Sequence, residues 1–451
     1  MSESIWHPDP EQLMSTRVAD LMTKVGMPID PEDVGGSVRR FVRWSQQQPE
    51  RFWPAVLDDL GGVWSRGYSQ VVDLSDGPEW ADWFPGGETN IAMNCVDIPA
   101  AQMPDDLALI AEDEEGNSRR WNFTEADREI QKLAQLLSQL GIERGDRIAC
   151  LMPMVGEVVF AMLATMKIGA VFMPIFSGYA PPSVRERLED SGARLLFTAD
   201  VGNRRGRRFD LKSQADLAVE GLESLQHLVV LRRGDGGAPM TDGRDLWRQD
   251  SIASIEGDSC TEMMAAMDPA LMIYTSGTTG KPKGTVHTHA GCMAQMGKEV
   301  RYNFDVRPHK DLFWWFSDIG WMMGPWLIFA SLLNRATLAI FDGSPIERGY
   351  GQFLSDARVT MLGVVPSLVR AWRESGCMQD LDWKTIRSMA STGECFNADD
   401  MAWLMRLNGH RPMIEYCGGT ELAGGYISGT VLHPAIPGCF STLTLGTDAV
   451  I

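Results

Sequence analysis

The segment 274–284, Tyr-Thr-Ser-Gly-Thr-Thr-Gly-Lys-Pro-Lys-Gly, combines residue types that bind anions. Its glycines let successive backbone N–H groups converge on one point, while its hydroxyl and lysine side chains add hydrogen bonds and positive charge. These properties suit a polyphosphate. The segment is not a Walker A loop, because Gly277 and Gly280 enclose only two residues and a proline follows the first lysine. A flexible surface loop is the alternative, but the apolar run 270–274 before it is typical of a buried strand and favours phosphate binding.

The elements that position this loop follow an alternating pattern of helices and strands. Thr124 is expected to cap a helix, with Asp127 resembling the second half of a capping box and Gly141 ending the apolar stripe. Strands are expected at 147–152, 171–175 and 193–198. This alternation predicts parallel sheets with helices on both faces. Ligands of such sheets lie beyond the carboxyl ends of the strands, which is where the phosphate loop is expected.

The length of the chain, 451 residues, allows two or three units that each have a core. We expect an N-terminal cap packed on the rest of the molecule over 1–105 and a first α/β subdomain over 106–234. A polar linker or excursion over 235–269 is then expected to lead into a second α/β subdomain over 270–451.

Composition restricts the partners of this protein. The net charge of −19 argues against nucleic acid, because phosphate backbones require basic surfaces. Two apolar stretches, 158–176 and 312–333, contain charged residues, glycine and proline, so we expect no membrane span. The cysteines stand singly and no signal peptide is recognisable, which predicts a cytoplasmic protein. His287 and His289 offer two metal ligands, but no third ligand accompanies them.

The segment 274–284 resembles the phosphate loop of AMP-forming acyl-CoA synthetases, which belong to the superfamily of adenylate-forming enzymes. Four further motifs match that family in order and approximate spacing, namely Trp83-Phe-Pro-Gly-Gly87, Asp318-Ile-Gly-Trp321, Ser391-Thr-Gly-Glu394 and Gly418-Gly-Thr-Glu421. The first of these looks like the acetyl-CoA-synthetase-like branch. The resemblance implies an α/β fold with parallel-rich sheets flanked by helices, as in the large N-terminal domain of these enzymes.

The resemblance also implies a two-step reaction catalysed by an acid–thiol ligase. A small-molecule carboxylate attacks the α-phosphorus of ATP, which gives an acyl-adenylate and pyrophosphate. The thiol of coenzyme A then displaces AMP and forms a thioester. ATP, Mg²⁺ and coenzyme A are therefore the implied cofactors and substrates, and the protein acts mainly by positioning groups and stabilising charge.

Two motifs are implied to hold the phosphates of ATP. The phosphate loop contributes Thr275, Ser276, Gly277, Thr278, Thr279, Gly280 and Lys283. From the second motif, Thr420 hydrogen-bonds the α-phosphate and Glu421 binds Mg²⁺, an ion that takes few protein ligands and bridges phosphate oxygens. The residues expected to act in catalysis are Thr278, Lys283, Thr420 and Glu421.

Two segments are implied to enclose the adenine. One wall consists of Gly393, Glu394 and Cys395, and the other of Glu415, Tyr416 and Cys417. The sequence departs from the family here, because the usual stacking aromatic aligns with Cys417 and the tyrosine lies one residue earlier. Either the adenine rests on the thiol and backbone, or Tyr416 reaches round.

The acyl pocket is implied to be lined by Trp321, Met322, Met323, Thr392 and Gly418. Trp321 can instead line the pantetheine route or pack in the core. Acetate-specific relatives carry a tryptophan at the position of Gly418, so the glycine predicts a larger pocket for a short- to medium-chain or branched acid rather than for acetate. The alternative is that another side chain fills this space.

The basic segment 202–208 stands out in an acidic protein. A solvated run of charge is one explanation. The acetyl-CoA-synthetase-like branch, however, places arginines at the positions of Arg204 and Arg207, where they bind the phosphates of coenzyme A.

The family pattern continues past Ile451 with a small lid domain that carries a catalytic lysine. We therefore expect a large domain without its lid, as a truncated or natural fragment of reduced activity. An adenylation domain that loads a carrier-protein thiol and a nucleotide-binding fragment without turnover are the alternatives. The oligomeric state is left open, a homo-oligomer included.

Overall fold

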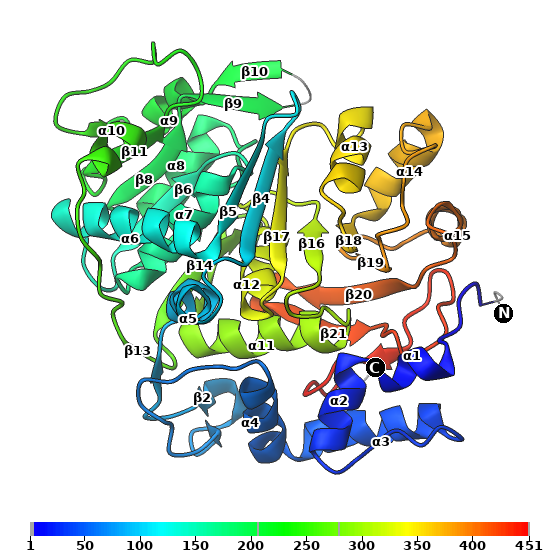
Figure 1. The fold of residues 1–451 in the computed structure, drawn as a ribbon. Coiled ribbons are helices and arrows are strands. Elements are labelled where there is room, and N and C mark those ends of the chain that lie inside the picture. The colour runs from blue at the N-terminus through cyan, green and yellow to red at the C-terminus, as the bar shows by residue number, and fades with distance from the viewer. Residues whose placement is uncertain (1–3, 205–206, 278–279, 450–451) are drawn as a thin grey trace.

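The computed structural model describes residues 4–204, 207–277 and 280–449, which form two large sheets with helices packed on them (Figure 1). The first sheet has seven strands, in the order β12 (Asp245–Trp247), β11 (His227–Leu231), β8 (Leu195–Ala199), β6 (Arg147–Leu151), β7 (Val171–Pro174), β14 (Pro269–Thr275) and β15 (Lys283–Thr288). Every neighbouring pair is parallel except β14 and β15, which form an antiparallel hairpin at the edge.

The second sheet has nine strands. Their order is β22 (Thr442–Leu443), β21 (Gly424–Ser428), β20 (Met413–Gly419), β19 (Ser388–Ser391), β18 (Met361–Val364), β16 (Leu312–Trp315), β17 (Thr337–Asp342), β4 (Leu107–Asp113) and β5 (Ser118–Asn122). The strands from β20 to β4 are parallel and both edges are antiparallel. The predicted class, α/β with parallel-rich sheets, is confirmed.

Ten helices follow the alternating pattern along the part of the chain that the structure describes. They are α6 (Phe123–Gln139), α7 (Gly156–Lys167), α8 (Pro181–Ser191), α9 (Leu211–Val219), α10 (Arg248–Ala253), α11 (His289–Tyr302), α12 (Met323–Leu333), α13 (Arg348–Asp356), α14 (Pro366–Ser375) and α15 (Ala398–Leu407). None of the described helices has the length and apolar character needed to cross a bilayer. The apolar stretch 158–176 folds as most of α7 followed by the buried strand β7, and the stretch 312–333 folds as the buried strand β16 followed by α12.

The sheets divide the chain differently from the four ranges expected from the sequence. The strands β4 and β5 lie in the second sheet, beside β17, although they come early in the chain (Figure 1). The hairpin of β14 and β15 lies in the first sheet, and β12 within the expected linker also joins that sheet. The two halves are therefore interleaved in sequence.

The first helix of the alternating region begins earlier than predicted. Asn122, not Thr124, caps α6, and it forms a reciprocal capping box with Glu125. The Thr124 hydroxyl instead donates to the carbonyl of Pro104. Asparagine is as good an N-cap as threonine, so residue preference alone did not separate the two positions.

The N-terminal residues form a layer of helices against α11, seen in blue in Figure 1. The helices of this layer are α1 (Pro10–Met14), α2 (Arg17–Lys24), α3 (Val34–Gln47) and α4 (Pro49–Asp59), of which α2 and α4 contact α11. The helix α5 (Ile98–Gln102) packs against α6 instead. Asp59, at the end of α4, accepts hydrogen bonds from Arg301 at 2.5 Å and from the Tyr302 hydroxyl at 2.9 Å. This largely buried ion pair fixes the N-terminal helices to the centre of the molecule.

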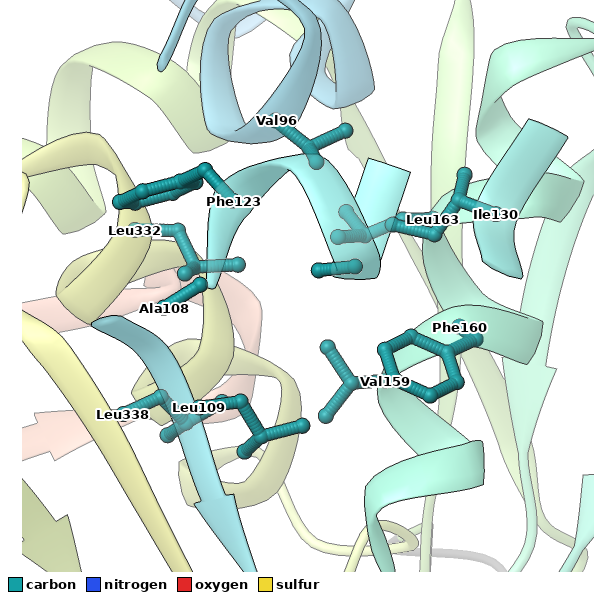
Figure 2. A pocket seen from close by; sticks show the side chains of 11 residues that line it. Val96, Ala108, Leu109, Phe123, Ile130, Val159, Phe160, Leu163, Leu332 and Leu338 are labelled. Atoms are coloured by element: carbon teal, nitrogen blue, oxygen red, sulfur yellow. The ribbon is translucent and has the colours of Figure 1, made fainter. Parts of the chain in front are cut away.

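A closed gap lies where the two halves of the fold meet (Figure 2). Leu109 and Leu338 reach it from β4 and β17, and Phe160 and Leu163 reach it from α7. Its volume is about 10 Å³, roughly the space of one water molecule, and its lining is entirely apolar. It is a packing gap in the core, and the chemistry must take place elsewhere.

Candidate functional site

The predicted phosphate loop is the tip of the hairpin formed by β14 and β15. Thr275 pairs with Lys283, so residues 276–282 form the connection. Gly277 and Gly280 have φ of 61° and 85°, which only glycine adopts readily. Thr278 and Thr279, two of the predicted phosphate ligands, lie outside the described residues.

The chain doubles back tightly at Gly277. A Cβ added there would lie 2.1 Å from the carbonyl oxygen of Lys281. A hydrogen atom is therefore required at this position by space as well as by φ. Ser276 and Lys283 are exposed on either side of the tip.

The Thr-Glu motif forms a short turn between two strands of the second sheet. The strand β20 ends at Gly419, the 3₁₀ turn η3 covers Thr420–Leu422, and β21 returns antiparallel to β20. Thr420 is half-buried and Glu421 is exposed. The turn packs against β15, so the two motifs predicted to hold ATP are neighbours although they lie on different sheets.

His287 marks the contact between these two motifs. Because side chains alternate along a strand, Lys283, Thr285 and His287 share one face of β15. Burial lowers the pKa of His287, and this effect outweighs the backbone of Thr420 and the carboxylate of Glu421, which both raise it. The face of β15 that carries Lys283 therefore meets the Thr-Glu turn, an arrangement that sequence reasoning missed.

His287 and His289 do not form a metal site with any third ligand among the described residues. His289 is fully buried, and its Nδ1 accepts a hydrogen bond from the backbone N–H of Ile91 at 3.2 Å. Burial lowers the pKa of His289 to about 3. This second histidine ties the start of α11 to the N-terminal part of the chain.

The two predicted adenine walls are adjacent in the structure. The hydroxyl of Thr392 donates to the carbonyl of Tyr416 at 2.6 Å, which joins the segment after β19 to β20. Gly393 turns the chain with φ of 93°. Glu394 accepts hydrogen bonds from the backbone and hydroxyl of Ser367, and Cys395 is exposed.

Tyr416 does not reach round toward the position of the missing stacking aromatic. Its ring is buried against Phe304 and Trp326, with centroids 5.6 and 6.0 Å away. Cys417 is half-buried, and its thiol donates to the hydroxyl of Tyr426 at 3.0 Å. The aromatic ring beside Cys417 is therefore that of Tyr426 on β21. The pairing of β20 with β21 shifts register between Cys417 and Gly418, which the sequence pattern did not reveal.

Glu415, also predicted to line the adenine, is a buried carboxyl group. Its Oε1 has no hydrogen-bond partner among the described residues, and burial raises its pKa to about 7. The folded protein therefore holds this proton at a pH where the unfolded chain, with an ordinary value of 4.5, has released it. Stability must fall as pH rises between these two values and level off above the higher one.

We expect Glu415→Gln to remove this pH dependence. The neutral amide avoids burial of a charge, and the gain in the free energy of unfolding at pH 8 is up to about 3 kcal/mol. Urea unfolding of both proteins at pH 5 and pH 8 measures the difference. The same loss of stability with pH in the variant would show that Glu415 is not its source.

Gly418 has a different role from the one predicted. It is exposed, but a Cβ at this position would lie 2.1 Å from the carbonyl oxygen of Gly424 on β21. The glycine is required by the close approach of two backbones, so an indole at 418 would force the strands apart. The inference of a pocket enlarged at this position is therefore not supported by the geometry.

The loops that follow β7 and β16 bring the carboxyl ends of the two sheets together. The hydroxyl of Ser177 donates to Asp318 at 2.6 Å, and Trp321 packs on Phe176 with centroids 5.3 Å apart. Trp321 is 49% exposed, so it lies at the surface of this junction and not in the core. Met322 and Met323 are half-buried beside it at the start of α12.

The predicted coenzyme A arginines lie on a separate hairpin. The strands β9 (Val201–Arg204) and β10 (Arg207–Asp210) pair with Arg204 opposite Arg207. Arg207 is exposed, and its neighbour Arg208 forms an ion pair with Glu115 at 3.0 Å. The hairpin places at least one unburied positive charge at the surface of an acidic protein.

The interleaved sheets and the glycine-rich hairpin packed against the Thr-Glu turn define an α/β protein of the adenylate-forming class. The sequence model described as "AMP-binding enzyme" matches residues 96–448, and the model described as "Acetyl-coenzyme A synthetase N-terminus" matches residues 38–95. The chain belongs to the AMP-binding enzyme family.

Its relatives include acyl- and acetyl-CoA synthetases. The chain is 33% identical over 459 residues to hexanoyl-CoA synthase of Cannabis sativa and covers 63% of that protein. It is 34% identical over 414 residues, 89% of this chain, to acetyl-coenzyme A synthetase of Deinococcus radiodurans and covers 62% of it. Acetoacetyl-CoA synthetase from Streptomyces lividans matches 99% of this chain with a TM-score of 0.90 and 26% identity, and the match covers 69% of that structure. The predicted relationship to AMP-forming acyl-CoA synthetases is confirmed.

Proposed function

We propose that this protein activates a carboxylic acid with ATP and transfers the acyl group to coenzyme A. In the first step a carboxylate oxygen bonds to the α-phosphorus while the bond to pyrophosphate breaks. In the second step the thiolate sulfur bonds to the acyl carbon and AMP leaves with both electrons of the broken bond. The coarser assignment, to a family of adenylate-forming ligases, is the basis of this proposal.

The convergence of the phosphate hairpin and the Thr-Glu turn along β15 is the observation that carries the proposal. A polyphosphate at the hairpin tip would lie next to a hydroxyl from Thr420 and a carboxylate from Glu421. Lys283 projects from the same face and would neutralise phosphate charge in both the ground state and the transition state.

Mg²⁺ fits this arrangement. Octahedral Mg²⁺ retains several waters and needs only one or two carboxylates together with phosphate oxygens, which Glu421 and ATP would provide. The bound ion would withdraw charge from the phosphates. The role left to the chain is to fix Glu421 at the turn and to hold the phosphates against the hairpin.

For the acid, we propose a short- to medium-chain or branched carboxylate. The names of the relatives refer to acetyl, acetoacetyl and hexanoyl groups, which span this range. Met322 and Met323 support it as well, because flexible thioether side chains adapt to apolar ligands of varied shape.

The arginine hairpin supplies a prediction specific to the second step. Replacing Arg204 and Arg207 together with glutamine is expected to raise the KM for coenzyme A by about 10-fold or more, because charge-assisted phosphate contacts are lost. Adenylation should be unchanged. Steady-state thioester formation is compared with Arg208→Gln, whose side chain already pairs with Glu115. A loss of adenylation in the double variant would contradict the assignment.

Trapping with hydroxylamine tests the proposed adenylate itself. With Mg²⁺, ATP and an acid, hydroxylamine should capture the acyl group as a hydroxamate in proportion to the AMP formed. Thioester formation with free coenzyme A, in the absence of any carrier protein, would separate the proposed ligase from a carrier-loading adenylation domain. Binding of ATP without any hydroxamate would favour a nucleotide-binding fragment.

A further inference from the structure

We propose that His287 is a positioning residue: it holds the Thr420–Glu421 turn in the orientation in which the turn binds Mg²⁺ and ATP. The inference rests on the proposed function, because it concerns the same phosphates. It assigns a role to a buried side chain that the two ligand-binding motifs do not include.

The location of His287 is the first observation. It lies on β15, on the same face as Lys283, and it is 8% exposed. Its ring interacts with two groups of the second sheet, by a hydrogen bond with the Thr420 backbone and by electrostatic attraction with the Glu421 carboxylate. A side chain at this point fixes the distance between the phosphate hairpin and the carboxylate that would bind the metal.

The second observation is an unsatisfied nitrogen. Nε2 of His287 is buried and has no hydrogen-bond partner among the residues that the structure describes. Such a group lowers stability, whereas an apolar side chain of similar shape would not. The ring already interacts with the backbone of Thr420, and its unsatisfied nitrogen is available to a partner that arrives with the nucleotide.

The neighbouring histidine provides a contrast. Nε2 of His289 also has no hydrogen-bond partner among the described residues, but His289 is fully buried and its Nδ1 accepts a hydrogen bond from the backbone N–H of Ile91, far from the phosphate hairpin's tip. It belongs to α11 and faces the N-terminal part of the chain. His287, by contrast, lies on β15 where this strand contacts the Thr-Glu turn.

The test compares His287→Leu, His287→Asn and His287→Gln with the unaltered chain. Calorimetry gives the Kd for ATP with Mg²⁺ and with EDTA, and their ratio measures the gain in affinity due to the metal. The thermal midpoint without ligand measures stability separately. Val286→Ala is the matched control, because Val286 is exposed on the opposite face of the same strand.

His287→Leu is expected to reduce the Mg²⁺-dependent gain by about 10- to 100-fold, as for other groups that orient a metal ligand. Its thermal midpoint without ligand should equal or exceed that of the unaltered chain. Either His287→Asn or His287→Gln should restore most of the gain, since an amide replaces one of the two ring nitrogens. The control should leave both quantities unchanged.

Three results would overturn the inference. They are an unchanged Mg²⁺-dependent gain in His287→Leu, a loss of gain that only accompanies a lowered thermal midpoint, and failure of both amide variants to restore it. In each case the unaltered chain would still bind ATP with Mg²⁺, so the proposed function would stand. A lack of such binding in the unaltered chain would instead refute the proposed function, and this inference with it.

Discussion

Glu421→Gln is expected to lower carboxylate-dependent ATP–pyrophosphate exchange by about 100-fold or more, the effect of removing a charged group that stabilises a transition state. Glu421 is exposed at the tip of η3, so the substitution should not change the thermal midpoint. The amide keeps the shape of the side chain but removes the negative charge that Mg²⁺ requires. Exchange measured over a range of Mg²⁺ concentrations should show a raised requirement for the ion.

Glu256→Gln serves as the matched control for that variant. Glu256 is also an exposed glutamate, but it lies in the segment between α10 and β13 (Met264–Ala265), which contributes none of the predicted site residues. It should leave exchange unchanged. If Glu421→Gln kept full exchange at low Mg²⁺, the carboxylate would not be a metal ligand, and the Thr-Glu turn would lose its proposed role.

Gly277→Ala is expected to have the second large effect, a loss of exchange of about 100-fold together with weaker ATP binding. The added Cβ would meet the Lys281 carbonyl oxygen at 2.1 Å, and φ of 61° is itself unfavourable for alanine. The tip of the hairpin must therefore open, which moves the backbone N–H groups and Lys283 away from one another.

Gly280→Ala separates the two causes. Gly280 has φ of 85°, but no described atom lies within 4 Å of an added Cβ. This variant should therefore show only the smaller effect of backbone strain. ATP binding by calorimetry and exchange kinetics check both variants. Equal losses at Gly277 and Gly280 would mean that space at the Lys281 carbonyl does not determine the shape of the loop.

The local elements of this fold could be predicted because their signals are local. The apolar run before the phosphate loop became β14, and the strands expected at 147–152, 171–175 and 193–198 are β6, β7 and β8. The glycines of the loop signalled an irregular backbone, and Gly277 and Gly280 have positive φ in the structure, but the hairpin itself was not predicted. Periodicity and turn chemistry are carried by neighbouring residues, so a single sequence records them.

Long-range pairing could not be read in the same way. The placement of β4 and β5 beside β17 and the return of β14 and β15 to the first sheet depend on partners far away in the chain. The same limit explains the adenine segment. Tyr416 is drawn into a cluster with Phe304 and Trp326, and Tyr426 reaches Cys417 only because β21 pairs with β20.

Gly418 shows a further limit of reasoning by resemblance. Comparison with acetate-specific relatives predicted that Gly418 enlarges the acyl pocket. The structure shows instead that the backbone at Gly418 closely approaches Gly424. A small residue can be present for ligand space or for chain packing, and only the surrounding atoms distinguish these reasons. His287 was likewise visible in the sequence, but its position beside Thr420 was not.

Carboxylate-dependent ATP–pyrophosphate exchange tests the central proposal most directly. The measurement uses the unaltered chain with Mg²⁺, ATP, labelled pyrophosphate and straight-chain acids from acetate upward. We predict exchange that requires both the acid and Mg²⁺ and that occurs with short- to medium-chain acids of this series. Tight binding of ATP without exchange for any acid would contradict the proposal that this protein forms an acyl-adenylate.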